Sequence, residues 1–154
     1  MRIREATDED MPRVGKLFRE YQQWLGIDLC FQGFEEELLS LPGSYAPPKG
    51  VILIAIENSK LVGCVGIRPR TRDEAELKRL YVQPDHRGHN IGKLLFHTAM
   101  SKAGEIGYTS IVLDTLPTMQ TARSLYLAYG FKKIPGYYDN PVEGVGYYKY
   151  VFSL

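Results

Sequence analysis

Cysteine is scarce in this sequence, and long apolar runs are missing from it. Cys30 and Cys64 lie far apart and form no C-x-x-C pair, which argues against a disulfide framework and predicts two free thiols. No apolar run approaches the roughly 18 residues that a membrane helix needs, and residues 51–56 form a run of buried-strand length. Residues 1–5 contain no basic leader followed by an apolar segment. We therefore expect a cytoplasmic protein that does not enter a membrane.

The chain also lacks an excess of charge of one sign. Its 154 residues include 19 lysines and arginines against 18 acidic residues, so nothing draws the whole molecule to nucleic acid. The length predicts a single domain, residues 1–154. One basic cluster comprises Arg68, Arg70, Arg72, Lys78 and Arg79. Because Asp73, Glu74 and Glu76 are interleaved with it, a solvated turn is favoured over a nucleic-acid site.

Spacing typical of metal ligands is missing as well. His86 and His89 fall in an expected turn, and His97 falls on the polar stripe of an expected helix. Their arrangement matches no usual ligand set. We expect no metal and interpret these histidines as solvated or facing a phosphate.

Apolar periodicity and turn residues predict seven strands and four helices. The strands are expected at residues 3–6, 50–57, 61–68, 75–82, 108–114, 131–134 and 145–152, with a three-residue turn at 58–60. The helices are expected from about residue 8 through Leu25, and at 34–39, 91–106 and 119–129. Antiparallel strands followed by a βαβ-like half predict an α/β (α+β) fold. Its sheet would be mixed, mostly antiparallel, of about six to seven strands, with helices on both faces.

The most informative stretch is Leu80–Leu95, where an apolar strand passes through a glycine-bearing turn into a helix. The first backbone N–H groups of that helix have no intrahelical partner, and Arg87 and Lys93 add full charges, so the turn suits a diphosphate. A dinucleotide fingerprint is missing because Gly88 and Gly92 are four residues apart. The Walker pattern is missing too, since no glycine stands five residues before Gly92.

The remaining pattern resembles the acyl-CoA loop of the GNAT superfamily of N-acetyltransferases. The family loop reads Gln/Arg-x-x-Gly-x-Gly/Ala, which corresponds to Arg87, Asn90 and Gly92. Asn90 replaces a glycine, and asparagine is among the few residues that tolerate left-handed backbone angles. A second family signature, Leu-Tyr-x-x-x-Gly-Phe, is matched by residues 125–131, about 35 residues later and in the right order.

This resemblance implies acetyl-CoA as the acyl donor and a set of residues that hold it. The backbone of Leu80, Tyr81 and Val82 would bind the pantetheine arm. The loop of Arg87, Gly88, His89, Asn90, Ile91, Gly92 and Lys93 would bind the diphosphate. Tyr126 would contact the cofactor and protonate the leaving thiolate, unless it merely packs in the core. The family often has an asparagine at the position of Met119, so one usual contact is missing.

The acceptor side leaves alternatives open. Glu76 stands where some family members carry a glutamate that deprotonates the amine. On a regular strand it would share a face with Lys78, Leu80 and Val82, so an ion pair with Lys78 is an equal interpretation. Asp114 and Tyr138 are candidates for amine binding or proton relay, and Asp114 could instead be a simple cap.

The function that these residues predict is transfer of an acetyl group to a primary amine of a small molecule or peptide. Neither cysteine lies in the motifs, so transfer within a ternary complex is expected rather than an acyl-enzyme. A non-catalytic acyl-CoA-binding or sensor domain is the alternative. The loops at residues 25–49 and 135–145 would select the acceptor. A homodimer through the C-terminal strands is possible within the family.

Overall fold

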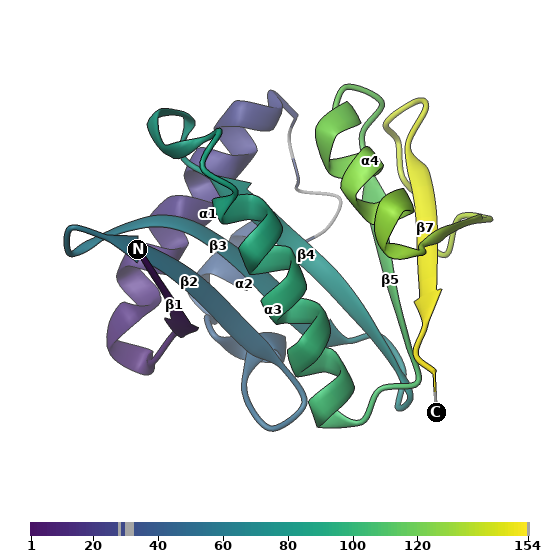
Figure 1. Ribbon diagram of the computed structural model, residues 1–154, viewed down its shortest axis with the longest axis horizontal. Coiled ribbons are helices and arrows are strands. Elements are labelled where there is room, and N and C mark those ends of the chain that lie inside the picture. The colour runs from purple at the N-terminus through teal and green to yellow at the C-terminus, as the bar shows by residue number, and fades with distance from the viewer. Residues whose placement is uncertain (28, 30–32, 154) are drawn as a thin grey trace.

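The computed structural model describes residues 1–27, 29 and 33–153 (Figure 1). The strands are β1 (Arg2–Glu5), β2 (Val51–Glu57), β3 (Lys60–Pro69), β4 (Glu74–Val82), β5 (Ser110–Thr115), β6 (Lys132–Ile134) and β7 (Gly146–Val151). The helices are α1 (Met11–Leu25), α2 (Phe34–Leu39), α3 (Ile91–Ile106) and α4 (Gln120–Tyr129). Every predicted strand and helix is therefore confirmed. Cys64 is a buried free thiol, whereas Cys30 lies outside the described residues.

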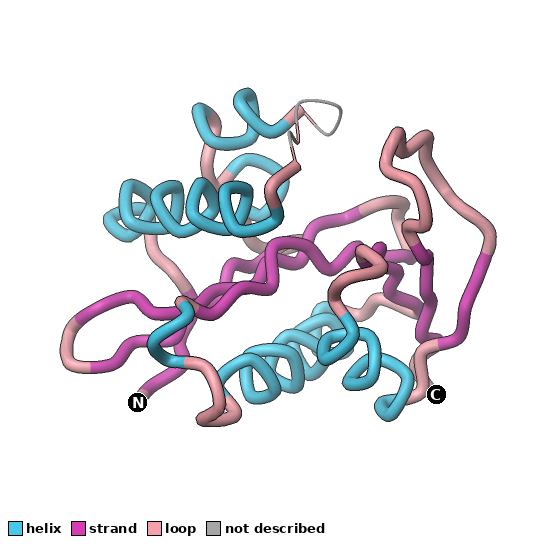
Figure 2. Tube along the Cα trace, turned by 90° about the horizontal axis from the view of Figure 1, so that it is seen from above, coloured by secondary structure: helices cyan, strands magenta, loops and turns pink. Residues whose placement is uncertain are grey.

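Within the described residues, the seven strands form one sheet in the order β1-β2-β3-β4-β5-β7-β6. Only β4 and β5 pair in parallel, and α3 makes the crossover between them. Helices α1 and α2 cover one face and α3 and α4 the other (Figure 2). The mixed, mostly antiparallel sheet with helices on both faces is thus as predicted.

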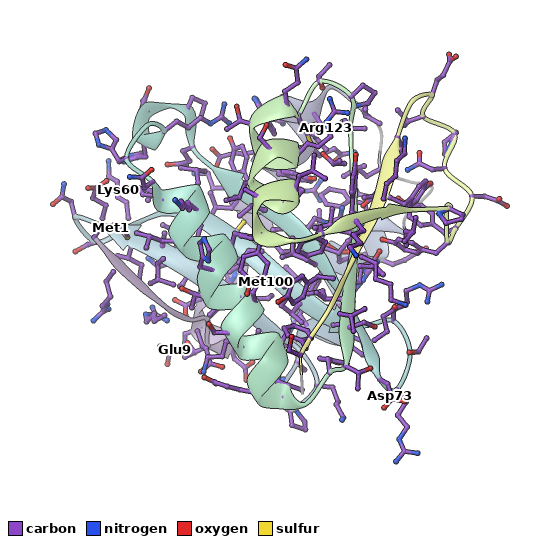
Figure 3. The ribbon with its side chains drawn as sticks, turned by 45° about the vertical axis from the view of Figure 1, so that its right-hand side comes forward. Met1, Glu9, Lys60, Asp73, Met100 and Arg123 are labelled. Atoms are coloured by element: carbon purple, nitrogen blue, oxygen red, sulfur yellow. The ribbon has the colours of Figure 1, made fainter. Side chains whose placement is uncertain are left out.

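Each face of the sheet buries its own apolar cluster. Val14, Leu17 and Phe18 of α1 pack with residues of β2 and β3 on one side. On the other side α3 contributes the larger cluster, in which Met100 is 1% exposed (Figure 3). Among the described helices, none is both long and apolar enough to cross a membrane.

The connection between β2 and β3 differs from the expected three-residue turn. Lys60 pairs with Glu57, so only Asn58 and Ser59 remain in the loop. Both have positive φ angles, 51° and 65°. That combination is typical of the tight type I′ hairpin, whose twist matches that of the strands.

A bulge in β4 overturns one prediction about which residues share a face. Arg79 has a φ angle of 62°, and the register with β3 shifts there, because Cys64 opposes Tyr81 whereas Gly66 opposes Lys78. As a result Leu80 and Val82 pack on the α3 side, together with Leu77, rather than on the side of Glu76 and Lys78. The four residues predicted to share a face are therefore divided between both faces.

Strands β4 and β5 separate just before the bulge. Strand β4 pairs with β5 only from Glu74 to Glu76, opposite Ser110 to Val112, and the two strands then diverge (Figure 1). The backbone of β4 from Leu80 to Val82 therefore has β3 on one side and, among the described strands, none on the other.

Candidate functional site

A large groove opens over the split between β4 and β5. Its volume is about 990 Å³, within the range of ligand sites in proteins. The end of α1, the end of β4, the turn before α3 and the start of α4 contribute its walls. The lining residues are Trp24, Leu25, Leu80, Tyr81, Val82, His86, Arg87, Gly88, Asn90, Ile91, Gly92, Lys93, Thr118, Met119, Gln120, Thr121, Ala122 and Leu125.

The turn at the mouth of this groove has the conformation that the sequence predicted. Asn90 adopts the left-handed region with a φ angle of 63°, as expected of asparagine, and Gly88 has a φ angle of 83°. The first intrahelical bond of α3 runs from Leu94 N–H to the Asn90 carbonyl, 3.0 Å away. The preceding N–H groups of the helix thus have no intrahelical acceptor and suit an anion.

Arg87 lines the groove, and two kinds of contact hold its side chain in place. Its Nε donates to the Val82 carbonyl at 2.9 Å. Its guanidinium lies 4.5 Å from the ring centroid of Trp24 and 5.7 Å from that of Tyr81. The Val82 carbonyl, which has no partner strand on that side, is satisfied in this way.

A second, inner cavity of about 40 Å³ lies at the split itself, large enough for two or three waters. It shares Leu25, Leu80 and Met119 with the groove. The other lining residues are Tyr21, Ile27, Leu29, Leu77, Lys78, Arg79, Asp114, Thr115, Leu116, Tyr126, Asn140 and Val142. Residues from both loops predicted to select the acceptor are among them.

Tyr126 lines the inner cavity from α4 and is 3% exposed. Its ring packs against Phe96 and Phe131, so the core-packing interpretation holds for the ring. Burial raises the pKa of its phenol well above the usual value, which keeps the hydroxyl protonated at neutral pH. No hydrogen-bond partner for that hydroxyl exists among the described residues.

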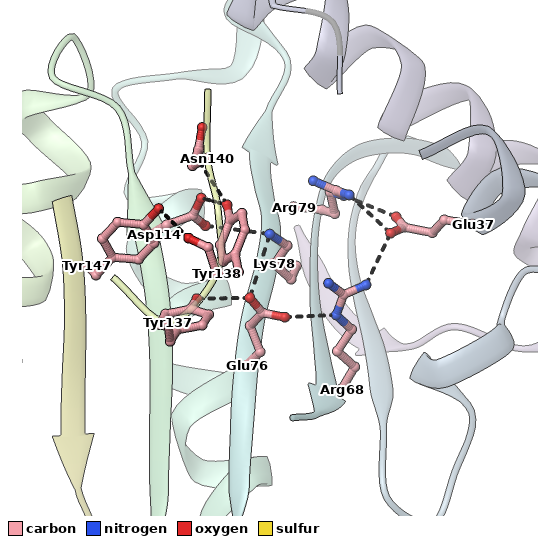
Figure 4. A network of polar contacts seen from close by, with 10 residues as sticks. All are labelled: Glu37, Arg68, Glu76, Lys78, Arg79, Asp114, Tyr137, Tyr138, Asn140 and Tyr147. Carbon is pink, nitrogen blue, oxygen red and sulfur yellow. Dashed lines mark hydrogen bonds and ion pairs between the residues drawn. The ribbon is translucent and has the colours of Figure 1, made fainter. Parts of the chain in front are cut away.

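Asp114 also lines the inner cavity, and it belongs to a network of polar contacts (Figure 4). The Tyr138 hydroxyl donates a hydrogen bond to it, and Asn140 donates to the Tyr138 hydroxyl at 2.9 Å. Lys78 Nζ is 3.5 Å from the Asp114 carboxylate. Burial lowers the pKa of the Lys78 ammonium, while Asp114 and Glu76 act against that change. Asp114 is therefore a paired carboxylate and not a simple turn cap.

Glu76 is held by three partners and is not among the residues that line either cavity. Arg68 Nε donates to it at 3.0 Å, the Tyr137 hydroxyl donates at 2.8 Å, and Lys78 Nζ is 3.7 Å away. The predicted ion pair with Lys78 is present (Figure 4).

The structure brings together most of the predicted site residues, with three exceptions. Glu76 and Tyr138 reach the inner cavity only through partners, and His89 does not line the groove. Sequence reasoning missed Trp24, because the end of a helix carries no signal of what lies beside it. It also missed that Lys78 would touch Asp114, because that contact joins side chains 36 residues apart in the sequence.

The basic cluster near the β3–β4 turn is divided, because Arg70 and Arg72 are exposed, as expected of a solvated turn, whereas Lys78 and Arg79 are buried. Arg79 is 3% exposed and binds Glu37 of α2 at 3.0 Å, and Arg68 lies between Glu37 and Glu76. Arg70 pairs with Glu74. In the part of the chain that the structure describes, no three histidines, cysteines or carboxylates gather as a metal-binding group.

Comparison with known proteins places these features in context. Residues 9–131 match the family described as "Acetyltransferase (GNAT) family". An uncharacterized N-acetyltransferase of Schizosaccharomyces pombe is 39% identical over 147 residues, covering 94% of this chain and 90% of the relative.

Solved structures show the same fold. An acetyltransferase from Streptococcus agalactiae has a TM-score of 0.80 and 25% identity, with 98% of each chain covered. The PaiA N-acetyltransferase from Thermoplasma acidophilum, solved in complex with coenzyme A, has a TM-score of 0.75 and 22% identity, again with 98% of each chain covered.

Proposed function

The chain belongs to the GNAT acetyltransferase family, and we propose that it moves an acetyl group from acetyl-CoA to a primary amine of a small molecule or peptide. The relatives are named as N-acetyltransferases, which favours an enzyme over a non-catalytic acyl-CoA-binding domain. We also propose that it works in the cytoplasm, as expected from its two isolated cysteines.

The meeting of two cavities at the split is the observation that carries this proposal. The groove has the volume and the N–H donors for an elongated anionic ligand, and the inner cavity has the acid–base groups. Leu25, Leu80 and Met119 line both. The thioester of a donor bound along β4 would therefore lie beside the polar network of the inner cavity.

The donor supplies an acyl group bound to a good leaving group. The amine nitrogen bonds to the carbonyl carbon, the carbon–sulfur bond breaks, and the sulfur leaves as a thiolate. Tyr126, which lines the inner cavity, gives its phenolic proton to that thiolate. The proton released by the amine passes to the carboxylate side of the cavity.

Two carboxylates are candidates to accept that proton. Asp114 lines the inner cavity directly, whereas Glu76 is joined to it through Lys78. We assign amine binding and proton acceptance to Asp114, with Tyr138 holding its carboxylate in place. Glu76 then has the role of an ion-pair partner that keeps Lys78 oriented.

The test is release of coenzyme A thiol when an amine is added to enzyme and acetyl-CoA. We expect Tyr126→Phe to lower the turnover by about a hundredfold, the usual contribution of a general acid. Tyr129→Phe, one turn further along α4, is the matched control and should leave turnover unchanged. Turnover of Tyr126→Phe equal to the parent would remove Tyr126 from the acid role. If no amine from a broad panel causes thiol release, the binding-domain alternative is favoured.

A further inference from the structure

Trp24 stands at the end of α1 and is part of the groove wall. It is the only tryptophan of the sequence, and 44% of it is exposed. Its ring lies 5.8 Å from that of Tyr81 and 6.4 Å from that of Tyr21. Neither the loop motif nor the α4 signature includes it. The partly exposed indole therefore contacts one tyrosine of α1 and one of β4, and it lines the groove.

That face is the surface on which Arg87 rests. The guanidinium carbon is 4.5 Å from the Trp24 ring centroid, well within the distance for a cation–π contact. Nε of Arg87 is already used, because it donates to the Val82 carbonyl. Among the described residues, no acceptor contacts the two terminal amino groups of Arg87. These four N–H donors therefore have no acceptor among the described residues, while the Val82 carbonyl and the Trp24 ring hold the rest of the guanidinium.

We propose that Trp24 is a positioning residue that holds the Arg87 guanidinium so that its two unused amino groups meet the diphosphate of the acyl donor. This inference rests on the proposed function, because it needs a ligand with a diphosphate in the groove. An arginine fork binds phosphate oxygens bidentately only when its plane is correctly oriented. The Val82 carbonyl fixes one edge of the guanidinium, and the indole fixes its plane.

The contact between Trp24 and Arg87 also links the donor side of the site to the acceptor side. Helix α1 also supplies Tyr21 and Leu25 to the inner cavity, on the acceptor side. The stack of Trp24 on Arg87 is thus a direct contact between that helix and the turn that precedes α3. Displacement of the end of α1 would therefore move the Arg87 guanidinium and change the affinity for the donor.

The effect of losing the indole should be modest and specific. A cation–π contact at an exposed position corresponds to about a twofold to fivefold change in affinity. We expect Trp24→Ala and Trp24→Leu each to weaken CoA binding about fivefold by calorimetry. Trp24→Phe keeps an aromatic face and should stay within twofold of the parent. Leu127→Ala is the control for loss of an exposed apolar side chain, because Leu127 is 50% exposed on α4 and does not line the groove.

A double-mutant cycle separates positioning from packing. If Trp24 acts through Arg87, then Trp24→Ala should cost less than twofold once Arg87→Ala is present. The same fivefold loss in both backgrounds would overturn the proposal, as would a Trp24→Leu variant that binds like the parent. Unfolding midpoints within a few degrees of the parent show that each variant is folded. If the parent itself fails to bind CoA, the proposed function is wrong, and that result differs from parent binding with an uncoupled Trp24.

Discussion

Arg79 carries a left-handed backbone angle that costs an ordinary side chain about 1 to 2 kcal/mol. Its side chain makes contacts that offset this cost. The guanidinium binds the Glu37 carboxylate through Nε and Nη2, each at 3.0 Å, and lies over the Phe34 ring at 5.1 Å. The Cys64 thiol donates to the Arg79 carbonyl at 3.3 Å. A single residue thus connects α2 to the bulge in β4.

The two candidate carboxylates can be distinguished by exchanging each for its amide. Asp114→Asn should lower thiol release about a hundredfold, because it removes the proton acceptor at the cavity wall. Glu76→Gln keeps the shape of the side chain and one acceptor oxygen for Arg68, and it replaces the oxygen that accepts from Tyr137 by an amide NH2. It should lose tenfold or less. Initial rates at saturating acetyl-CoA measure both.

Circular dichroism and CoA affinity serve as folding controls for the two amides. A Glu76→Gln loss as large as that of Asp114→Asn would contradict our assignment. It would return the base to Glu76, the position that the family resemblance indicates.

At the scale of elements, Asp10 anchors the start of α1 to β1. Its carboxylate accepts hydrogen bonds from Arg4 at 2.7 Å, from Arg13 at 2.8 Å and from Thr7 N–H at 2.8 Å. These contacts, with the bond from Arg4 as the largest cause, hold the pKa of Asp10 well below its usual range. The position of α1 on the sheet, and so of its groove residues, depends in part on this side chain.

A pH-dependent loss of stability follows for Asp10→Asn. The depressed pKa stabilises the folded protein at every pH above the value of the unfolded residue, about 3.9. That stabilisation is lost as the pH falls below it. We expect Asp10→Asn to lower the free energy of unfolding by about 2 kcal/mol at pH 7, at the low end for a buried charged group because both arginines are partly exposed.

Urea unfolding of parent and variant at pH 7 and pH 3 measures this difference, which should shrink at the lower pH. Asp8→Asn is the control, since Asp8 belongs to the same turn and is exposed. An equal effect of Asp10→Asn at both pH values would show that its charge does not matter.

The elements themselves were predictable because local patterns determine them. The apolar spacing of α3 and the β-branched run of β2 are strong local signals, and the Asn90 turn has the conformation expected of asparagine. The bulge was not predictable, since nothing in the sequence around Arg79 resembles a glycine-containing irregularity. Long-range contacts fix it, above all the pairing with Glu37, which is 42 residues away. The same holds for the contact of Trp24 with Arg87, which joins segments that are distant in the sequence.

At the scale of the whole molecule, the two halves of the sheet are joined at the split by only a short parallel ladder. A ligand that lies along β4 and contacts α1, α3 and α4 connects both halves, and should therefore stabilise the entire fold by mass action.

We expect acetyl-CoA at a hundred times its dissociation constant to raise the unfolding midpoint by about 5 to 10 °C for a protein of this size. NAD and ATP at the same concentration are controls for dinucleotides and phosphates in general. Differential scanning fluorimetry measures all three. An equal rise with ATP would point to a general phosphate site, and no rise with acetyl-CoA would contradict the proposed donor.

The split between β4 and β5 also affects how readily other polypeptide chains can pair with the sheet. An interior gap leaves β4, beyond Glu76, with a strand edge that has no strand beside it, and such edges are templates on which other chains pair and aggregate. Here the edge is short and bulged at Arg79, and the end of α1 and the start of α4 flank it in the groove. To pair with this edge, a strand of another protein would have to fit, with its side chains, between those two helices. The fold can thus keep an open edge for a slender ligand arm while denying it to other polypeptides.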